Sequence, residues 1–449
     1  MLKSNSIGLS GLIFQGMGQL SPLFTFDGII SVAAFALGAS PLAFIIGMIA
    51  SLLTGNTLYQ FSKRTASARG YYGYAMYGGR PLSFYVAFLY IIYQMANMLF
   101  VISFLIMIFS PALSYLTGIN VPGYYGLLTI IIIIPAFYAV YSGIRASFKT
   151  QLIINLIEIA FIIIVSFSVI LTSKDNSYIV FTPVSGYKNL FLGFITGSFL
   201  AYTGYGSIVS LGEEAREPRK NIGLAVMLMI LIIGLIDVLI SYSLVIGFGI
   251  GKMYDFSNTI IPAFIVIRNH LGIYASVLFF ALNFVIIYTL FNTVLTSLTR
   301  NIYAMARDNI INKMFLKLNK NGTPVNALYL SILIFAVSLI ISLMVFYKYY
   351  GYNGFLDAFI FFATLSTMAT LIIHIIVNTS LSVNKRSFVY DVLMPGISSI
   401  IILIAMYYAL IDAAFPFNYS IIAIVLYSLM VMILYPFKMH KHNLNYSIK

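Results

Sequence analysis

Residues 81–144 read PLSFYVAFLYIIYQMANMLFVISFLIMIFSPALSYLTGINVPGYYGLLTIIIIIPAFYAVYSGI, a run of 64 positions without one charged side chain. A helix needs about 20 mainly apolar residues to cross a bilayer. The run is therefore long enough for two spans, and Ser110-Pro111 and Val121-Pro122-Gly123 mark the turn between them. We predict helices over 82–110 and 123–143.

The composition of the whole chain also indicates a membrane protein. Only 37 of its 449 residues are charged, 25 Lys or Arg and 12 Asp or Glu, and 61% are hydrophobic. A soluble domain has about a quarter of its residues charged, and an outer-membrane barrel alternates apolar and polar residues. The sequence therefore predicts an all-α polytopic membrane protein, because helices satisfy their own backbone hydrogen bonds in lipid.

Several kinds of chemistry and partner find no support in the sequence. The chain has no cysteine, so we expect no disulfide and no thiolate nucleophile. The four histidines are scattered, which argues against a metal cluster, and we expect no metal and no cofactor. The net charge of +13 is explained by basic loops on one side of a membrane. We therefore expect membrane lipid, and no nucleic acid, around the protein.

Further apolar stretches complete the set of expected helices. The turn Ala39-Ser40-Pro41 divides the first apolar region into two. Beyond the two helices given above, the predicted spans are 9–38, 41–61, 148–172, 189–211, 222–250, 273–305, 325–347, 355–380, 389–411 and 418–437. The total is twelve transmembrane helices, and an even number places both termini on the same side.

The distribution of basic residues agrees with this count. Twenty of the 25 Lys and Arg fall on the side of the termini, and five fall on the other side: Lys174, Lys188, Lys252, Arg268 and Lys348. One missed helix would place every later loop on the opposite side of the membrane and remove this asymmetry. Because Lys and Arg are enriched in cytoplasmic loops, we expect a multi-pass protein of the plasma membrane with both termini in the cytoplasm.

Two predicted helices contain residues that favour an interruption. The helix at 9–38 includes Gln15-Gly16-Met17-Gly18-Gln19-Leu20-Ser21-Pro22, and the helix at 189–211 includes Ala201-Tyr202-Thr203-Gly204-Tyr205-Gly206-Ser207. Each is the first helix of five if the chain forms two repeats, over 9–172 and 189–380, followed by two additional helices over 389–437. Broken helices at matching positions are typical of transporters built from inverted repeats. Close packing of glycines between helices is the alternative interpretation.

Three motifs resemble those of one known family. Residues 212–222 (GEEAREPRKNI) resemble the signature that follows the sixth helix of amino acid–polyamine–organocation (APC) permeases. Residues 297–308 (SLTRNIYAMARD) and 322–327 (GTPVNA) are similar to the end of the eighth and the start of the ninth helix in that family. The resemblance covers essentially the whole chain. It implies a LeuT-like fold of twelve helices, a 5+5 inverted repeat plus two, and a single membrane transport domain over 1–449.

The resemblance also implies where a substrate would bind. The first broken helix of the family binds the substrate carboxylate through its backbone, and the second helps to enclose the substrate. The corresponding positions here are Gly16, Met17, Gly18, Gln19, Leu20 and Ser21 in the first, and Ala201, Tyr202, Thr203, Gly204 and Tyr205 in the second. The family's glutamate in the second segment is replaced by Gly206. Gln94 and Asn97 share a face of the helix that lines the family's cavity, although they are equally compatible with polar contacts between helices.

Isolated charges inside the spans are candidates for ion coupling. Glu158 lies in the helix at 148–172, where some family members have a lysine that replaces a sodium ion and exchanges a proton. We predict proton coupling through Glu158, with sodium as the alternative. Asp237 could take part in coupling or make a polar contact between helices, and Asn292 is a weaker candidate for the ion site. We expect Asp27 to face water near the extracellular half, in a solvated or gating role.

Charged residues at the predicted cytoplasmic ends suggest a gate. Glu213, Glu214, Arg300 and Arg307 could form ion pairs that close the inner side, or belong to a solvated positive loop. The leading interpretation is a secondary active transporter that imports an amino acid or related amine by alternating access, with a proton as coupling ion. An amino acid/amine exchanger and a polyamine permease are the alternatives. No H-E-x-x-H and no P-loop is present, so we expect neither an enzyme nor ATP as energy source.

Overall fold

The computed structural model describes residues 6–119, 125–411 and 415–441. Apart from two isolated β-bridges, its regular elements are helical. The first part of the chain forms α1 (Leu9–Met17), η1 (Pro22–Phe24), α2 (Thr25–Ala36), η2 (Leu37–Ala39), α3 (Ser40–Arg64), α4 (Tyr71–Ala75), η3 (Met76–Gly78), α5 (Arg80–Thr117), α6 (Tyr125–Tyr141) and α7 (Ile144–Thr172). The turn predicted at Val121-Pro122-Gly123 lies outside the described residues.

The later part of the chain continues the same pattern of long helices joined by short elements. It forms η4 (Tyr178–Phe181), α8 (Tyr187–Gly193), η5 (Phe194–Ser198), α9 (Phe199–Ala201), η6 (Tyr205–Leu211), α10 (Pro218–Phe248), η7 (Ile250–Lys252), α11 (Met253–Ser257), α12 (Pro262–Leu271), α13 (Ile273–Arg307), η8 (Lys313–Leu316), α14 (Val325–Ser342), η9 (Leu343–Tyr347), α15 (Lys348–Tyr350), η10 (Gly351–Asn353), α16 (Gly354–Val383), η11 (Val389–Leu393), α17 (Met394–Leu410) and α18 (Phe417–Lys441).

Nine stretches of the described residues are long and apolar enough to cross a membrane. One of them, Leu9–Arg64, contains two of the predicted helices, and Gly126–Tyr141 is apolar but shorter. The predicted span at 189–211 is divided among short elements, so it has no single helix of spanning length. The structure is therefore that of an all-α membrane protein, and the number of twelve spans stays a prediction.

One predicted helix end is wrong. Ser110-Pro111 was expected to end the helix at 82–110, but α5 continues through Pro111 to Thr117. A proline lacks the amide hydrogen that an internal helical residue donates, yet transmembrane helices tolerate it because neighbouring groups satisfy the freed carbonyl. The helix ends instead before Gly118, whose φ of +73° is left-handed and whose amide donates to the carbonyl of Ser114.

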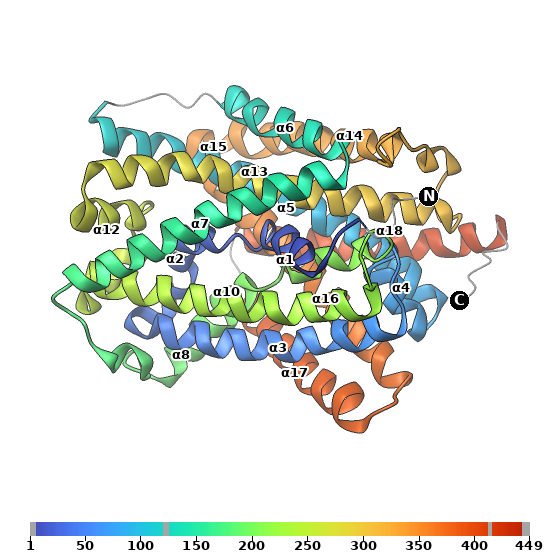
Figure 1. Cartoon of the computed structure of the whole chain (residues 1–449), viewed down its shortest axis with the longest axis horizontal. Coiled ribbons are helices and arrows are strands. Elements are labelled where there is room, and N and C mark those ends of the chain that lie inside the picture. The colour runs from blue at the N-terminus through green and yellow to red at the C-terminus, as the bar shows by residue number, and fades with distance from the viewer. Residues whose placement is uncertain (1–5, 120–124, 412–414, 442–449) are drawn as a thin grey trace.

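Polar residues point inward and apolar residues outward, which is the arrangement expected in lipid. On α7, Gln151, Asn155 and Glu158 are completely buried, whereas Ile153 and Leu156 between them are more than half exposed. In a soluble protein the exposed face would be the polar one. The buried stripe of α7 lies against α1, and α10 packs on α1 as well. Figure 1 shows α1 and α2 near the centre of the bundle, between α7 and α10.

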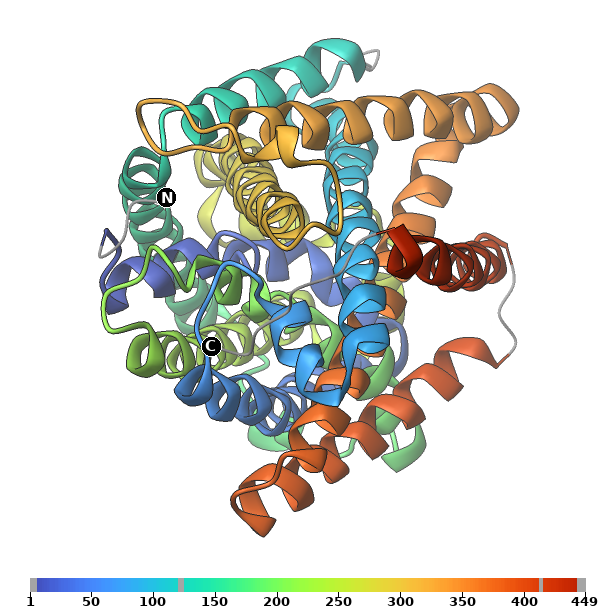
Figure 2. The same ribbon diagram turned by 90° about the vertical axis from the view of Figure 1, so that its right-hand side faces the viewer.

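The last two helices lie at the edge of the molecule. In Figure 2 the orange-red α17 runs along the lower edge of the molecule, and the dark red α18 lies at its right-hand edge. There α17 packs on α3 and α16, and α18 packs on α16 and α5. Their outward residues are large and apolar, such as Leu403 and Leu426. The interior of the bundle is therefore formed by the earlier helices, around the two interrupted ones.

Candidate functional site

The first helix is interrupted where the glycines, glutamines and proline predict it. The helical conformation of α1 ends at Met17, residues 18–21 are irregular, and η1 begins at Pro22. All six predicted site residues from Gly16 to Ser21 are buried. Gly18 is required by its surroundings, since an added Cβ would overlap the hydroxyl of Thr293 and lie 2.9 Å from the Gln151 amide. The irregular backbone thus approaches both α13 and α7 closely.

The second interrupted helix faces the first. Between α9 and η6, residues 202–204 form a turn. The carbonyl of Thr203 accepts a hydrogen bond of 3.0 Å from the Tyr93 hydroxyl, and an added Cβ on Gly204 would lie 2.9 Å from the side chain of Leu20. Tyr202 and Tyr205 are buried, and Ala201 is exposed. The structure therefore brings the two breaks together, as the repeat pattern predicts.

Gln94 and Asn97 take part in a hydrogen-bond network. The Gln19 amide nitrogen donates to the Tyr93 hydroxyl at 3.0 Å and to Gln94 Oε1 at 3.2 Å. Gln94 Nε2 donates to the Tyr90 hydroxyl at 2.7 Å, and Asn97 Nδ2 donates to the carbonyl of Tyr93 at 3.0 Å. The network connects α5 to the first break. Of these two predicted site residues, Gln94 contacts Gln19 directly, and Asn97 donates to the carbonyl of Tyr93 and to Gln94 Oε1.

The polar stripe of α7 contacts the same break. Asn155 Nδ2 donates to the carbonyl of Phe14 at 2.7 Å, and Gln151 Nε2 donates to Thr293 Oγ1 at 3.1 Å. Glu158 Oε2 accepts a hydrogen bond of 2.9 Å from the Ser21 hydroxyl. One oxygen of each α7 side chain in this stripe has no hydrogen-bond partner in the structure. Glu158 therefore lies against the segment in which a substrate is expected.

Two buried carboxylates lie at the first turn of α2: Asp27 belongs to that turn, and Asp237 on α10 contacts it. Asp237 Oδ1 on α10 accepts a hydrogen bond of 2.7 Å from the Thr25 hydroxyl, and Asp237 also hydrogen-bonds with Tyr202. Ser21 in the first break donates a hydrogen bond to Glu158, and Tyr202 in the second break hydrogen-bonds with Asp237. Each break therefore contacts an intramembrane carboxylate. Asp27 is only 4% exposed, so the expectation that it faces water is wrong. The physical reason is that the first turn of α2 packs inside the bundle, where Thr25 and Phe26 are buried together with Asp27.

Gly206 stands where the family resemblance implies a glutamate. An added Cβ there would overlap the ring and hydroxyl of Tyr71, so Tyr71 fills the space of the missing side chain. The Tyr71 hydroxyl lies 3.4 Å from His374 Nε2, and His374 is 2% exposed. Asn292, the weaker ion-site candidate, is completely buried on α13. Tyr71 belongs to the short helix α4. No motif in the sequence indicated that this helix lies next to the site.

The charged residues predicted as a gate form ion pairs at one end of the bundle. Arg300 donates to both carboxylate oxygens of Glu214 at 3.0 and 3.2 Å, and each side chain is only 2% exposed. Arg307 lies 2.5 Å from Glu213 and is about one-third exposed. Of the two predicted interpretations, ion pairing holds for all four residues. A solvated loop does not describe Arg300 and Glu214.

A third pair extends this cluster to the loop before α4. Arg69 donates two hydrogen bonds, of 2.7 and 3.0 Å, to Asp308, and the Tyr72 hydroxyl donates to the same carboxylate at 3.0 Å. Burial, together with the neighbouring Asp308 carboxylate, raises the pKa of the Tyr72 phenol well above its usual value. Tyr72 therefore keeps its proton and acts as a hydrogen-bond donor. The loop and α4 are thus attached to the end of α13.

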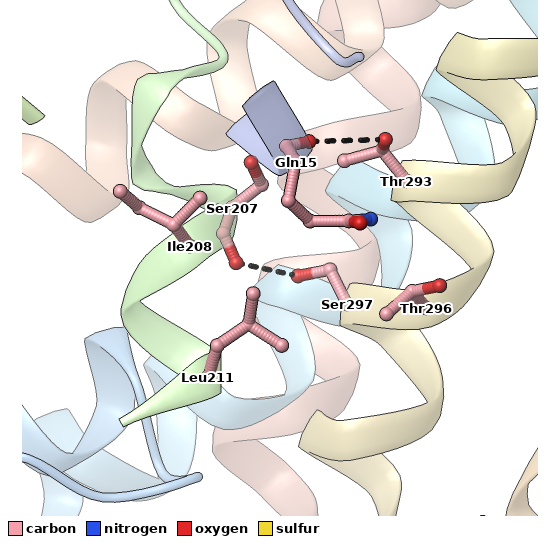
Figure 3. A pocket seen from close by; sticks show the side chains of 7 residues that line it. All are labelled: Gln15, Ser207, Ile208, Leu211, Thr293, Thr296 and Ser297. Carbon is pink, nitrogen blue, oxygen red and sulfur yellow. Dashed lines mark hydrogen bonds between the residues drawn. The ribbon is translucent and has the colours of Figure 1, made fainter. Parts of the chain in front are cut away.

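A narrow pocket lies between α1, η6 and α13, beside the first break. Its lining is formed by Gln15, Ser207, Ile208, Leu211, Thr293, Thr296 and Ser297, as Figure 3 shows. Thr293 Oγ1 donates to the carbonyl of Gln15 at 3.2 Å, and Ser297 Oγ donates to the carbonyl of Ser207 at 3.3 Å. Among the predicted site residues none lines this pocket. The spacing of Thr293, Thr296 and Ser297, three and four residues apart on one helical face, is the signal that could have found it.

A comparison with protein families identifies the class. The fold and the two facing breaks define a multi-pass membrane protein with an irregular segment buried at its centre. The chain matches the model of the amino acid permease family over residues 11–446, and it belongs to that family. Membership implies the LeuT-like fold and transmembrane amino acid transport, so the protein is a transporter and not an enzyme. No curated protein matches the chain in a sequence comparison.

Proposed function

We propose that this permease takes up an amino acid across the plasma membrane by alternating access, coupled to a proton that binds Glu158. One observation carries the proposal: Ser21, within the first break, donates a hydrogen bond of 2.9 Å to Glu158. A residue that gains or loses a proton is thereby linked directly to the backbone segment expected to hold the substrate. The proposal includes two five-helix repeats, over 9–172 and 189–380, and both termini in the cytoplasm.

The first break offers complementary groups for an α-amino acid. The carbonyl groups at the end of α1 carry partial negative charge, which suits an ammonium group, and the start of the helical segment beyond the break carries partial positive charge, which suits a carboxylate. Both groups are present in every α-amino acid, so the backbone supplies affinity for the class. Movement of the repeats around this segment would expose it first to one side of the membrane and then to the other.

The geometry of the α7 stripe favours a proton over a sodium ion. Its three unpartnered oxygens belong to Gln151, Asn155 and Glu158. The helical rise places the first and the last about 10 Å apart along the axis. Oxygen ligands of a single cation must all lie within about 2.6 Å of it. One ion cannot therefore use the whole stripe, whereas a proton needs only the Glu158 carboxylate.

The proposal can be tested in proteoliposomes that contain the purified protein and no sodium. We expect an inward pH gradient to drive uphill uptake of at least one of the twenty amino acids. Glu158→Gln should remove uphill uptake while exchange of labelled for unlabelled amino acid continues, because glutamine keeps the size of the side chain and cannot titrate. Glu217→Gln, at an exposed position, serves as the control.

Three results would contradict the proposal in different ways. Full uphill uptake by Glu158→Gln would remove Glu158 from coupling. Uptake that requires an amino acid on the opposite side, with no effect of the pH gradient, would identify an exchanger. Transport of spermidine in place of any amino acid would identify a polyamine permease, for which Asp237 and Glu158 would be the carboxylates that bind the amine.

A further inference from the structure

An apolar groove, which we call the α8–α17 groove, opens on the outer surface of the bundle. It has a volume of about 490 Å³ and is lined by Phe191, Ile400, Leu403, Ile404, Tyr407 and Tyr408. Phe191 of α8 meets Tyr408 of α17 edge to face, with ring centroids 5.7 Å apart, and this contact joins the two walls. Sites that hold small ligands typically have volumes of about 300–1,000 Å³. The groove is therefore large enough to bind a molecule that is not part of the chain.

The groove lies within the membrane, close to one of its surfaces. The stretch Val389–Leu410, which contains α17, is long and apolar enough to cross a bilayer. The contact with Phe191 is near the C-terminal end of α17, and the predicted topology places that end and the start of α8 on the extracellular side. Tyr187 and Tyr407 are 81% and 60% exposed, and exposed tyrosines are typical of the boundary between hydrocarbon and headgroups. The groove therefore faces the outer leaflet.

The dimensions of the groove favour an acyl chain over a helix of another protein. Its lining on α17 extends from Ile400 to Tyr408, which is about 12 Å along the helix axis. One leaflet contributes about 15 Å to the hydrocarbon core, so an acyl chain matches this length. A helix with its side chains is about 10–12 Å across, and 12 Å of it would need about 1,000 Å³. That volume exceeds the groove, whereas a single acyl chain is narrow enough to enter.

A basic side chain adds charge complementarity at the outer end of the groove. Lys188 lies three residues before Phe191, so the two side chains are neighbours on α8. Lys188 is exposed, and within the part of the chain that the structure describes it forms no ion pair. A phosphate group accepts strong, charge-assisted hydrogen bonds from an ammonium group. A lipid with an acyl chain in the groove would place its phosphate at the level of Lys188.

We propose that the α8–α17 groove binds one anionic phospholipid, with an acyl chain along α17 and the phosphate on Lys188. An anionic headgroup is preferred because a zwitterionic headgroup carries its own cation, which competes with Lys188 for the phosphate. The bound lipid contacts α8, which packs on α2 and leads through η5 and α9 to the second break. The groove is therefore a lipid site on an element that is continuous with the interrupted helix.

Because the sequence contains no tryptophan, a single introduced tryptophan can report on the groove in the full-length protein. Tyr407→Trp places this fluorophore in the groove, and Leu403→Trp is a second probe of the same wall. Leu333→Trp, at an exposed position of α14, reports on ordinary surrounding lipid. Each variant is reconstituted in equal mixtures of phosphatidylglycerol and phosphatidylcholine, in which one of the two lipids carries brominated acyl chains that quench tryptophan on contact. The ratio of the two quenching constants gives the headgroup preference, and the depth of the probe cancels.

A preference for the anionic lipid that depends on Lys188 is the expected result. At Tyr407→Trp we expect phosphatidylglycerol to be preferred about fivefold, which is the effect of one lysine on an anionic lipid. At Leu333→Trp we expect no preference. Adding Lys188→Gln should remove the preference, and adding Lys188→Arg should retain it. Lys348→Gln is the matched control, because Lys348 is exposed on α15, which lies on the opposite side of the bundle from α17 in Figure 1.

Three results would overturn the proposal. Equal quenching by both lipids at Tyr407→Trp would show that the groove makes only ordinary lipid contacts. A preference that survives Lys188→Gln would show that this lysine does not bind the phosphate. Much weaker quenching by either lipid than at Leu333→Trp would show that a protein surface, such as a second copy of the chain, covers the groove. Thermal unfolding shows whether each variant is folded, and because no step measures transport, the result is independent of the proposed function.

Discussion

Ser21 in the first break and Glu158 on α7 are joined by a buried hydrogen bond of 2.9 Å, although they lie 137 positions apart in the chain. A hydroxyl donates more strongly to a charged carboxylate than to a neutral carboxyl group. The position of the irregular segment and the protonation of Glu158 are therefore coupled through one contact. This contact is the physical basis of the proposed link between a proton and the movement of a substrate.

Loss of the Ser21 hydroxyl should weaken this coupling. Ser21→Ala removes the donor, and we expect uptake driven by a pH gradient to fall about tenfold, since a hydrogen bond to a charged group contributes about 1.5 kcal/mol or more. Ser21→Thr keeps the hydroxyl and should retain most of the uptake. Initial rates in proteoliposomes measure both. Equal rates for the two variants would show that Ser21 is not part of the coupling.

The contact between Thr25 and Asp237 should contribute to stability. Thr25→Val has nearly the same shape but leaves the Asp237 carboxylate without its 2.7 Å donor. We expect the free energy of unfolding to fall by about 1–2 kcal/mol, because hydrogen bonds within membrane proteins are individually modest. Thr25→Ser, the matched control, should cost less than half as much. Unfolding in mixed detergent micelles measures the difference, and equal costs would contradict the prediction.

Breaking the buried ion pair of Arg300 and Glu214 should destabilise the protein far more than breaking an exposed ion pair. Arg300→Met leaves Glu214 as an unpaired buried charge, and we expect a loss of about 3–5 kcal/mol in unfolding free energy. Replacing both residues by methionine should cost less than the single change, because no charge then remains buried. Lys220→Met breaks the exposed pair with Glu217 and should have almost no effect. A double-mutant cycle on detergent-solubilised protein provides these values.

Tyr71 and Gly206 should be replaceable only together. Gly206→Ala alone places a methyl group inside the Tyr71 ring, so we expect loss of folded protein or of transport. Adding Tyr71→Ala removes the overlap and should restore at least part of the folded yield. Size-exclusion chromatography and thermal unfolding measure this recovery. No recovery in the double variant would show that another contact excludes a side chain at position 206.

The attachment of Arg69 and Tyr72 to Asp308 should keep the pocket closed from that end of the bundle. Because the chain has no cysteine, Ser207→Cys introduces a single thiol in the pocket. We expect Asp308→Asn to raise its labelling rate by a membrane-impermeant maleimide about tenfold, since three hydrogen bonds to the carboxylate are weakened. Glu217→Gln is the control, and an unchanged rate in Asp308→Asn would argue against a gate.

Much of the fold followed from local patterns. Charge-free runs predicted the long helices, and the glycines and proline between Gln15 and Pro22 predicted the interruption of the first helix, because both depend on residues adjacent in sequence. The end expected at Pro111 was wrong, because whether a proline ends a membrane helix depends on its neighbours in space. The buried position of Asp27 was missed for the same reason, since the sequence does not show which way α2 turns after the break.

The candidate site was only partly predictable. The sequence by itself determined the class of protein, the two breaks and the intramembrane carboxylates, because hydropathy, backbone preferences and the cost of buried charge are properties of short segments. Only the tertiary structure decided that Ser21 contacts Glu158, that Tyr71 fills the space beside position 206, and that Gln15, Ser207 and Thr296 come together between α1, η6 and α13. Those relationships depend on which faces of distant helices meet, and helix packing determines that by fitting whole surfaces together.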